Sequence, residues 1–320
     1  MLERRLLPTL LKFNLLMNST LLPSSLIPSF ALGSDGPPLH FLHANGYPPA
    51  CYTPLLELLQ KKYHVFGMLL RPLWPDSNPD DINDWDPFSD DLLCFLSNHE
   101  TARVIGVGHS IGAIVTLRAA LRDPNKFRAL VLIDPVLFPP RRLISWNFIR
   151  AIGLGHRLHP MIAASQKRRR TFDNLHTVFR GYRNRKIFRY MSDENLRIYI
   201  EGITQPKDGG YELVFSPEWE TRIYFTGLRD FDIWRNLPRL KVPVLFIRGA
   251  ETDTFWEEAA KLVKRKQPRA KMETLEKSTH LLPLERPQEV FDIIQSFLKT
   301  LESDGSPSGI QRASSLTPKI

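Results

Sequence analysis

The sequence lacks the features that mark secreted disulfide-rich, zinc-binding or membrane-spanning proteins. It has two cysteines, Cys51 and Cys94, which are too few for a disulfide framework, and no Cys/His cluster has the spacing of a zinc site. No window approaches the roughly 18 uninterrupted apolar residues of a membrane-spanning helix. We therefore expect two buried thiols in a reducing, cytoplasmic compartment.

The two ends of the chain lack the pattern of a packed domain. Residues 1–28 contain many leucines with Arg4, Arg5 and Lys12, but three prolines interrupt them and no Ala-x-Ala cleavage pattern follows. We interpret them as a poorly ordered N-terminal extension, with organelle targeting or surface anchoring as alternatives. Residues 303–320 have few apolar side chains, which predicts a disordered tail.

Between these ends, short apolar runs alternate with helical patterns. The runs are LHFLHANG, YHVFGMLL, RVIGVGHS, RALVLIDP and VPVLFIRG, followed by a weaker, alternating KMETLE. Apolar runs separated by helices predict an α/β fold with a mostly parallel, doubly wound sheet. We expect the core to comprise residues 29–135 and 241–302, closed by a helix with one apolar face. SFALGSDGPPLHF predicts an additional antiparallel hairpin that turns at residues 34–36.

The strand pattern is interrupted over residues 136–240, which we expect to form a basic helical cap over one end of the sheet. Residues 137–240 have 19 basic and 10 acidic side chains, so they account for the whole net charge of +9. Such a charge could attract an anionic substrate or a membrane surface, or could be a solvated helical face. No nucleic-acid-binding motif accompanies it, so we expect no nucleic-acid partner.

The most informative stretch is VIGVGHSIGA, in which Ser110 follows a strand and precedes a helical pattern. Gly108 and Gly112 lie two residues before and after it, as the strained strand–turn–helix of a nucleophile elbow requires. The structural alternative is a serine that caps the helix. We favour the nucleophile, because the helix N-terminus would also stabilise negative charge near its hydroxyl.

A serine nucleophile needs a base, and the base needs an acid, in the chain order serine, acid, histidine. His280 is the candidate base, because STHLLPLERP follows the last expected strand. Asp253, after VPVLFIRG, is the first choice for the acid; Asp134, after LVLI, and Glu251 are the alternatives.

Tetrahedral oxyanions also need two backbone amides. We expect these from Ile111 and from the loop after LHFLHA, where Asn45 is preferred over Ala44 and Gly46.

FLHANG, GVGHSIGA, VPVLFIRGAETD and STHLLPLERPQEV together resemble the α/β-hydrolase superfamily, over residues 29–301. The resemblance implies a cap inserted after the strand that ends at Asp134, and an acid after the following core strand, which favours Asp253. Many relatives have His-Gly-x at the oxyanion loop, whereas this chain has His43-Ala44-Asn45-Gly46.

The expected function is cleavage of an ester-like bond in a small or lipid-like molecule, through an acyl-enzyme on Ser110, without a cofactor or metal. Thioester, lactone or carbon–carbon bond cleavage on the same residues are alternatives. Two further alternatives are a non-catalytic, hydrolase-like binding protein and a protein with peripheral membrane contact. The oligomeric state is left open by the sequence.

Overall fold

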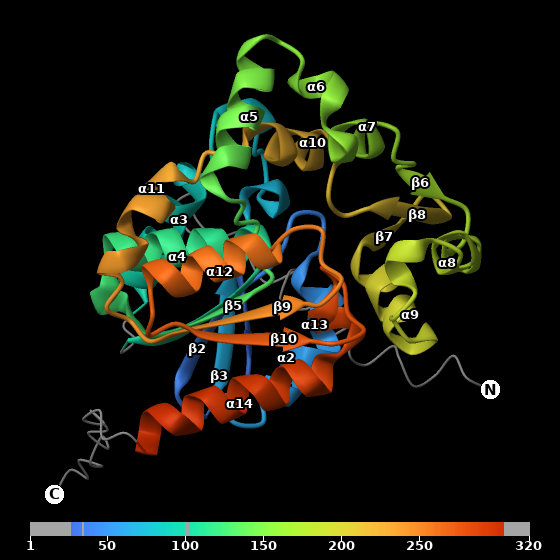
Figure 1. Cartoon of the computed structure of the whole chain (residues 1–320). Coiled ribbons are helices and arrows are strands. Elements are labelled where there is room, and N and C mark those ends of the chain that lie inside the picture. Colours follow the sequence, from blue (N-terminus) through green and yellow to red (C-terminus); the bar gives the residue numbers. More distant parts are fainter. Residues whose placement is uncertain (1–26, 34, 100–102, 304–320) are drawn as a thin grey trace, which may run out of the picture.

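The computed structural model describes residues 27–33, 35–99 and 103–303, and the expectations for residues 1–26 and 304–320 lie outside this part. A seven-stranded sheet with the order β1-β3-β2-β4-β5-β9-β10 forms the centre (Figure 1). All neighbouring strands are parallel except β1 and β3. The strands are β1 (Ser29–Leu32), β2 (Pro38–Leu42), β3 (His64–Met68), β4 (Val104–His109), β5 (Phe127–Ile133), β9 (Val244–Gly249) and β10 (Lys271–Leu275). The expected α/β class and parallel sheet are confirmed.

Helices cover both faces of this sheet (Figure 1). The helices on one face are α3 (Asp86–Asn98), α4 (Ile111–Arg122) and α12 (Glu257–Lys266); those on the other are α2 (Thr53–Leu59) and α14 (Pro287–Ser303), preceded by the short α13 (Leu282–Glu285). Strand β4 is buried along its whole length, because its alternate side chains face opposite helical layers. This double layer holds the carboxyl ends of β4, β5 and β9 at one edge of the sheet.

Short 3₁₀ helices shape several of the core loops. They are η1 (Pro49–Tyr52), η2 (Arg71–Leu73), η3 (Pro79–Asp81) and η4 (Pro124–Lys126). Three of the four contain proline at their first position, where its fixed φ and missing N–H fit the start of a turn.

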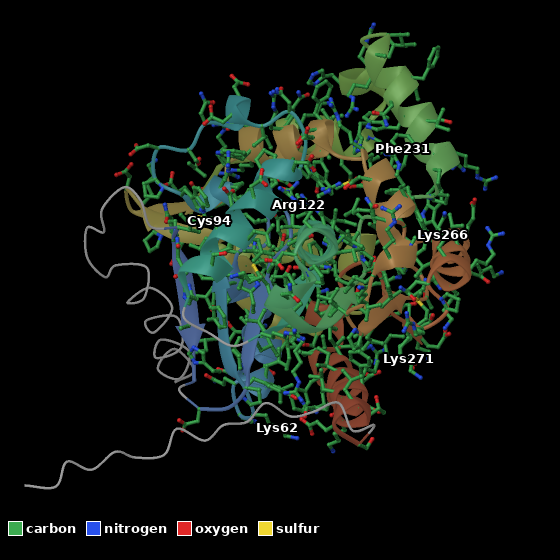
Figure 2. The ribbon with its side chains drawn as sticks, turned by 90° about the vertical axis from the view of Figure 1, so that its left-hand side faces the viewer. Lys62, Cys94, Arg122, Phe231, Lys266 and Lys271 are labelled. Carbon is green, nitrogen blue, oxygen red and sulfur yellow. The ribbon has the colours of Figure 1, made fainter. Side chains whose placement is uncertain are left out.

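Two expectations about the core are wrong. Strand β1 does not form a hairpin with β2; it pairs antiparallel with β3, which lies between them in the sheet. Strands β1 and β2 are therefore consecutive along the chain but are not neighbours in the sheet. Cys51 is buried as expected, but Cys94 is exposed on the solvent side of α3 (Figure 2).

Residues 136–240 lie between β5 and β9, and we call them the insertion. They contain α5 (Pro140–Ala151), α6 (Gly155–Leu158), α7 (Pro160–Gln166), α8 (Leu175–Arg183), η5 (Lys186–Phe188), α9 (Asp193–Gly202), α10 (Pro217–Thr226), α11 (Phe231–Asn236) and η6 (Leu237–Arg239). The insertion also contains a small antiparallel sheet, β6-β8-β7, which the helical expectation missed. Its strands are β6 (Thr171–Phe172), β7 (Thr204–Lys207) and β8 (Gly210–Leu213).

A buried ion cluster joins the insertion to the core. Arg118 of α4 binds Asp230 through Nη2 at 2.8 Å and Asp232 through Nε at 2.9 Å, at the start of α11. Burial raises the pKa of Asp230 to about 6 despite this positive neighbour. Removing Arg118 would leave a buried carboxylate unpaired, so the cluster fixes the end of the insertion on α4.

Within the part of the chain that the structure describes, no helix combines the length and apolarity needed to cross a membrane.

Candidate functional site

Ser110 lies at a sharp turn between β4 and α4. Its backbone has φ 59° and ψ −120°, a conformation that non-glycine residues rarely adopt and that costs free energy. Both flanking glycines are required by close backbone approach. A Cβ on Gly108 would lie 2.4 Å from the Gly112 carbonyl oxygen, and one on Gly112 would lie 2.3 Å from that of Leu42. The turn therefore has the geometry of a nucleophile elbow.

His280 lies beside this serine, in the loop between β10 and α13. Its Nε2 is 3.0 Å from Ser110 Oγ, and its Nδ1 is 2.7 Å from Asp134 Oδ2. Asp134 follows β5 directly and is completely buried. The structure thus brings together one hydroxyl, one imidazole and one carboxylate in a continuous hydrogen-bonded series.

The carboxylate of Asp134 is held by the loop after β9. The Gly249 amide donates to Oδ1 at 3.1 Å, and the Thr252 hydroxyl donates to Oδ2 at 2.5 Å. Each carboxylate oxygen therefore has a fixed donor, and Oδ2 faces His280 as well. Hydrogen bonds to the charged form favour that form and orient it.

The preference for Asp253 is corrected by this geometry. The Asp253 carboxylate is exposed, and its Oδ1 accepts a hydrogen bond from the neighbouring Thr254 hydroxyl. Glu251 binds Arg189 and Tyr190 of the insertion instead of His280. The reason is the path of this loop, which turns the Thr252 side chain inward and leaves both of its acidic neighbours outside.

Two residues that the sequence analysis did not single out, His109 and Tyr52, form a hydrogen-bonded chain to the backbone of His280. His109 is completely buried, and its Nε2 is 2.9 Å from the His280 carbonyl oxygen. A carbonyl only accepts, so Nε2 donates and Nδ1 accepts from the Tyr52 hydroxyl at 2.7 Å. Burial and the charge of His280 lower the pKa of His109 well below its ordinary value. His109 is therefore a neutral positioning residue.

The role of the two expected oxyanion donors, Ile111 and Asn45, stays a prediction. Ile111 is the first residue of α4, so its amide has no partner inside the helix. In the loop after β2, the Ala44 amide donates to the Tyr52 hydroxyl at 3.2 Å, which removes it as a candidate. The Asn45 side chain donates from Nδ2 to the Glu220 carbonyl at 3.2 Å and so fixes this loop against α10.

A cavity of about 450 Å³ lies between this loop and the insertion. Its lining includes Tyr47, four cationic side chains, one carboxylate and several aromatic rings; the charged groups are Lys167, Arg168, Arg169, Arg185 and Glu220. A Cβ on Gly46 would lie 3.3 Å from Glu220 Oε1 and 3.5 Å from an Arg168 nitrogen. The inner end of this cavity therefore adjoins the expected oxyanion loop.

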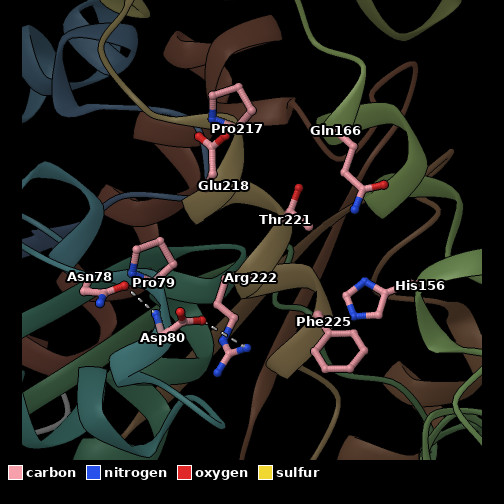
Figure 3. Close-up of a pocket in the computed structure, with 10 residues that line it drawn as sticks. All are labelled: Asn78, Pro79, Asp80, His156, Gln166, Pro217, Glu218, Thr221, Arg222 and Phe225. Carbon is pink, nitrogen blue, oxygen red and sulfur yellow. Dashed lines mark hydrogen bonds and ion pairs between the residues drawn. The ribbon is translucent and has the colours of Figure 1, made fainter.

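A second cavity of about 500 Å³ lies away from Ser110, between η3 and α10 (Figure 3). His156 stacks on Phe225 at one side, with ring centroids 4.1 Å apart. Arg222 points toward Asp80 at the other side, 3.7 Å away. The linings of both cavities lack Ser110, Asp134 and His280, but the first includes Tyr47 and Glu220, which adjoin the expected oxyanion loop, whereas the second includes no residue of that loop.

Comparison with known proteins identifies similar chains. The chain is 24% identical to the "Uncharacterized hydrolase YugF" of Bacillus subtilis over 259 residues, which covers 78% of this chain and 85% of that protein. It is 25% identical to a "Probable alcohol acetyltransferase" of Cyberlindnera fabianii, over 70% of this chain but only 61% of that protein.

Solved structures give the same fold. The crystal structure of E-2-(acetamidomethylene)succinate hydrolase superimposes with a TM-score of 0.69 at 21% identity, covering 85% of this chain and 95% of that one. The model of the alpha/beta hydrolase family matches residues 41–293, which include Ser110, Asp134 and His280. The chain belongs to the alpha/beta hydrolase family.

Proposed function

We propose that this protein is a serine hydrolase that cleaves an ester-like bond through Ser110, His280 and Asp134. The observation that carries the proposal is the series in which His280 is 3.0 Å from the Ser110 hydroxyl and 2.7 Å from the Asp134 carboxylate. Serine needs an adjacent base at neutral pH, and the base needs an orienting acid. An intact series argues against a purely structural role for Ser110.

In the first half-reaction, His280 Nε2 takes the proton of Ser110 Oγ as this oxygen attacks the carbonyl carbon. Asp134 keeps the Nδ1 proton of His280 in place and stabilises the imidazolium. The amides of Ile111 and Asn45 donate to the oxyanion, and the N-terminus of α4 adds to its stabilisation. The imidazolium then protonates the leaving alcohol as the acyl-enzyme forms.

In the second half-reaction, water takes the place of the alcohol. His280 accepts its proton as the oxygen attacks the acyl carbon, and then returns the proton to Ser110 Oγ as the carboxylic acid departs. Thioesters, lactones and activated carbon–carbon bonds could use the same groups. An ester is the simplest substrate that these groups serve.

Transfer of the acyl group to an alcohol is a second candidate, because three similar proteins carry the name acetyltransferase. The same acyl-enzyme would serve both reactions, and the acceptor would decide the product. We favour water, because the relatives that match most of their own length include the hydrolases.

The purified chain is expected to release p-nitrophenol from p-nitrophenyl butyrate, with butyrate as the second product. Chromatography of the products with and without added ethanol measures the acceptor. Butyrate as the main product in both assays supports the hydrolase, whereas ethyl butyrate as the main product with ethanol indicates the transferase. Release no faster than that by the Ser110→Ala protein contradicts both.

A further inference from the structure

The cavity beside the oxyanion loop has an unbalanced positive charge. Of its five charged side chains four are cationic, and only Arg168 pairs with the single acid, Glu220, at 2.7 Å. That contact uses Nη1 of Arg168. Among the described residues, no carboxylate lies within ion-pair distance of Lys167 or Arg185. The cavity thus has positive charge that its own acid does not neutralise.

The cationic cavity adjoins the loop that is expected to supply an oxyanion donor. Arg168 adjoins Gly46, one residue from the expected oxyanion donor Asn45, and its side chain is only 16% exposed. Partial burial strengthens the attraction of a cation for an anion, because less water screens it. Tyr47 and Tyr199, with ring centroids 5.4 Å apart, supply an apolar wall between the loop and α9. The cavity therefore combines a wall for carbon chains with a cationic end.

We infer that the substrate carries an anionic group, a carboxylate or phosphate, which Lys167, Arg168 and Arg185 bind in this cavity. The inference rests on the proposed function, because it places the anion on the same molecule as the scissile carbonyl. Guanidinium groups present paired donors to such oxygens. Binding there would hold the carbonyl near Ser110.

The test compares two p-nitrophenyl esters of matched length, the monoester of glutarate and the valerate. The wild-type protein is expected to have a kcat/KM about tenfold or more higher for the glutarate ester, mainly through a lower KM. The Lys167→Gln/Arg185→Gln protein should lose most of this preference, because its kcat/KM should fall far more for the glutarate ester than for the valerate ester. Arg170→Gln, an exposed cation outside the cavity lining, is the matched control.

Equal kcat/KM for the two esters in the wild type, or an unchanged preference in the double variant, overturns the inference and leaves the proposed function intact. Calorimetry with free glutarate measures the affinity of the wild-type and double-variant proteins for the anion without any hydrolysis. If neither ester is hydrolysed, the proposed function fails. Glutarate binding then still tests the anion site: binding that is lost in the double variant supports it, and binding that is absent or unchanged overturns it.

A different observation concerns the outer end of the insertion. Seven large apolar side chains in the described part are strongly exposed, and all seven belong to the insertion. Six of them lie on α5, on α6, in the turn between these helices and at the start of α7. We call these six the insertion tip: Ile144, Phe148, Ile152, Leu154, Leu158 and Met161. Phe148 is 64% and Ile144 62% exposed. Such a concentration marks an interaction surface.

The tip also has a one-sided charge. No acidic residue occurs between Pro135 and Phe172, whereas eight arginines and lysines do. Some of these are engaged, such as Arg141 with Glu258, but Arg157 is exposed beside Leu158. Helices α5 and α6 lie at the end of the molecule opposite α14 (Figure 1), so the core does not obstruct this surface.

We propose that the insertion tip inserts into the interface of a membrane that contains anionic lipid. Apolar side chains with neighbouring cations, and no acids among them, fit an acyl boundary below negatively charged headgroups. An apolar protein partner would explain the exposed side chains but not the absence of acids. The proposal does not depend on the reaction at Ser110.

Co-sedimentation with phosphatidylcholine vesicles, with and without phosphatidylserine, measures this binding. The wild type should bind the anionic vesicles at low salt, and Phe148→Ser/Ile152→Ser should reduce the binding about tenfold or more. Ile187→Ser, an exposed apolar residue of the insertion outside the tip, should bind as the wild type does. Similar binding by the Phe148→Ser/Ile152→Ser and wild-type proteins contradicts the proposal. So does wild-type self-association that this double variant abolishes, with no vesicle binding.

Discussion

The Ser110→Ala and His280→Ala proteins are each expected to lose about 10⁶-fold in kcat with p-nitrophenyl butyrate, down to the rate left by binding and the oxyanion donors. The hydroxyl and the imidazole, 3.0 Å apart, act as one unit: without the base the serine is a weak nucleophile, and without the serine the base has no proton to take. The loss should appear in kcat and kcat/KM together, because substrate binding in the cavity does not use Ser110 Oγ.

The double variant Ser110→Ala/His280→Ala distinguishes this mechanism from one in which Ser110 and His280 contribute to kcat independently. We expect it to be no slower than either single variant, because either change removes the whole nucleophilic route. Losses that multiply would show that Ser110 and His280 act separately and would contradict the proposed mechanism. Thermal unfolding of each protein controls for damage to the fold.

The second large effect concerns the acid. Asp134→Asn is expected to lower kcat about 10⁴-fold, whereas Asp253→Asn should change it by about twofold or less. Asparagine fits the volume of Asp134 and tolerates its positive φ of 40°, so the fold should survive. Its amide cannot accept from both the Gly249 amide and Thr252 and still orient His280 Nδ1–H, so the imidazole would adopt the wrong tautomer.

Asp253→Asn is the matched control for this prediction, since it makes the same chemical change on an exposed carboxylate of the neighbouring loop. A large loss in Asp253→Asn with near-normal turnover in Asp134→Asn would show that the loop rearranges during the reaction. The acid assignment would then return to the position that the sequence favoured.

Most of the correct predictions came from local sequence patterns. The elbow can be recognised from five residues, because close backbone approaches at the turn require glycine at positions 108 and 112. The parallel core strands were recognisable because burial on both faces demands continuous apolar runs. His280 was found because its loop follows the last strand.

What the sequence could not decide depended on neighbours far along the chain. Asp134 and Asp253 both follow apolar strands, and only the inward turn of Thr252 shows which carboxylate reaches His280. The expected hairpin failed because β3, 22 residues beyond the end of β2, takes the place beside β1. The small sheet of the insertion was missed because its strands are only two to four residues long and contain no run of apolar side chains.

His109 shows the same limit at the site itself. From the sequence, His109 was not a candidate for the base, because adjacent residues on a strand point to opposite faces and its neighbour is Ser110. The structure instead places it between the Tyr52 hydroxyl and the His280 carbonyl, two groups from distant segments. No local sequence pattern predicts a histidine that joins two such distant segments.

The most direct test of the central claim is the mass spectrum of peptides from the protein treated with a fluorophosphonate, which phosphonylates only activated serines. The account predicts one adduct, on Ser110, in the wild type, and none in the His280→Ala protein. An unmodified Ser110 in the active wild type, or an adduct on a different serine, would contradict it.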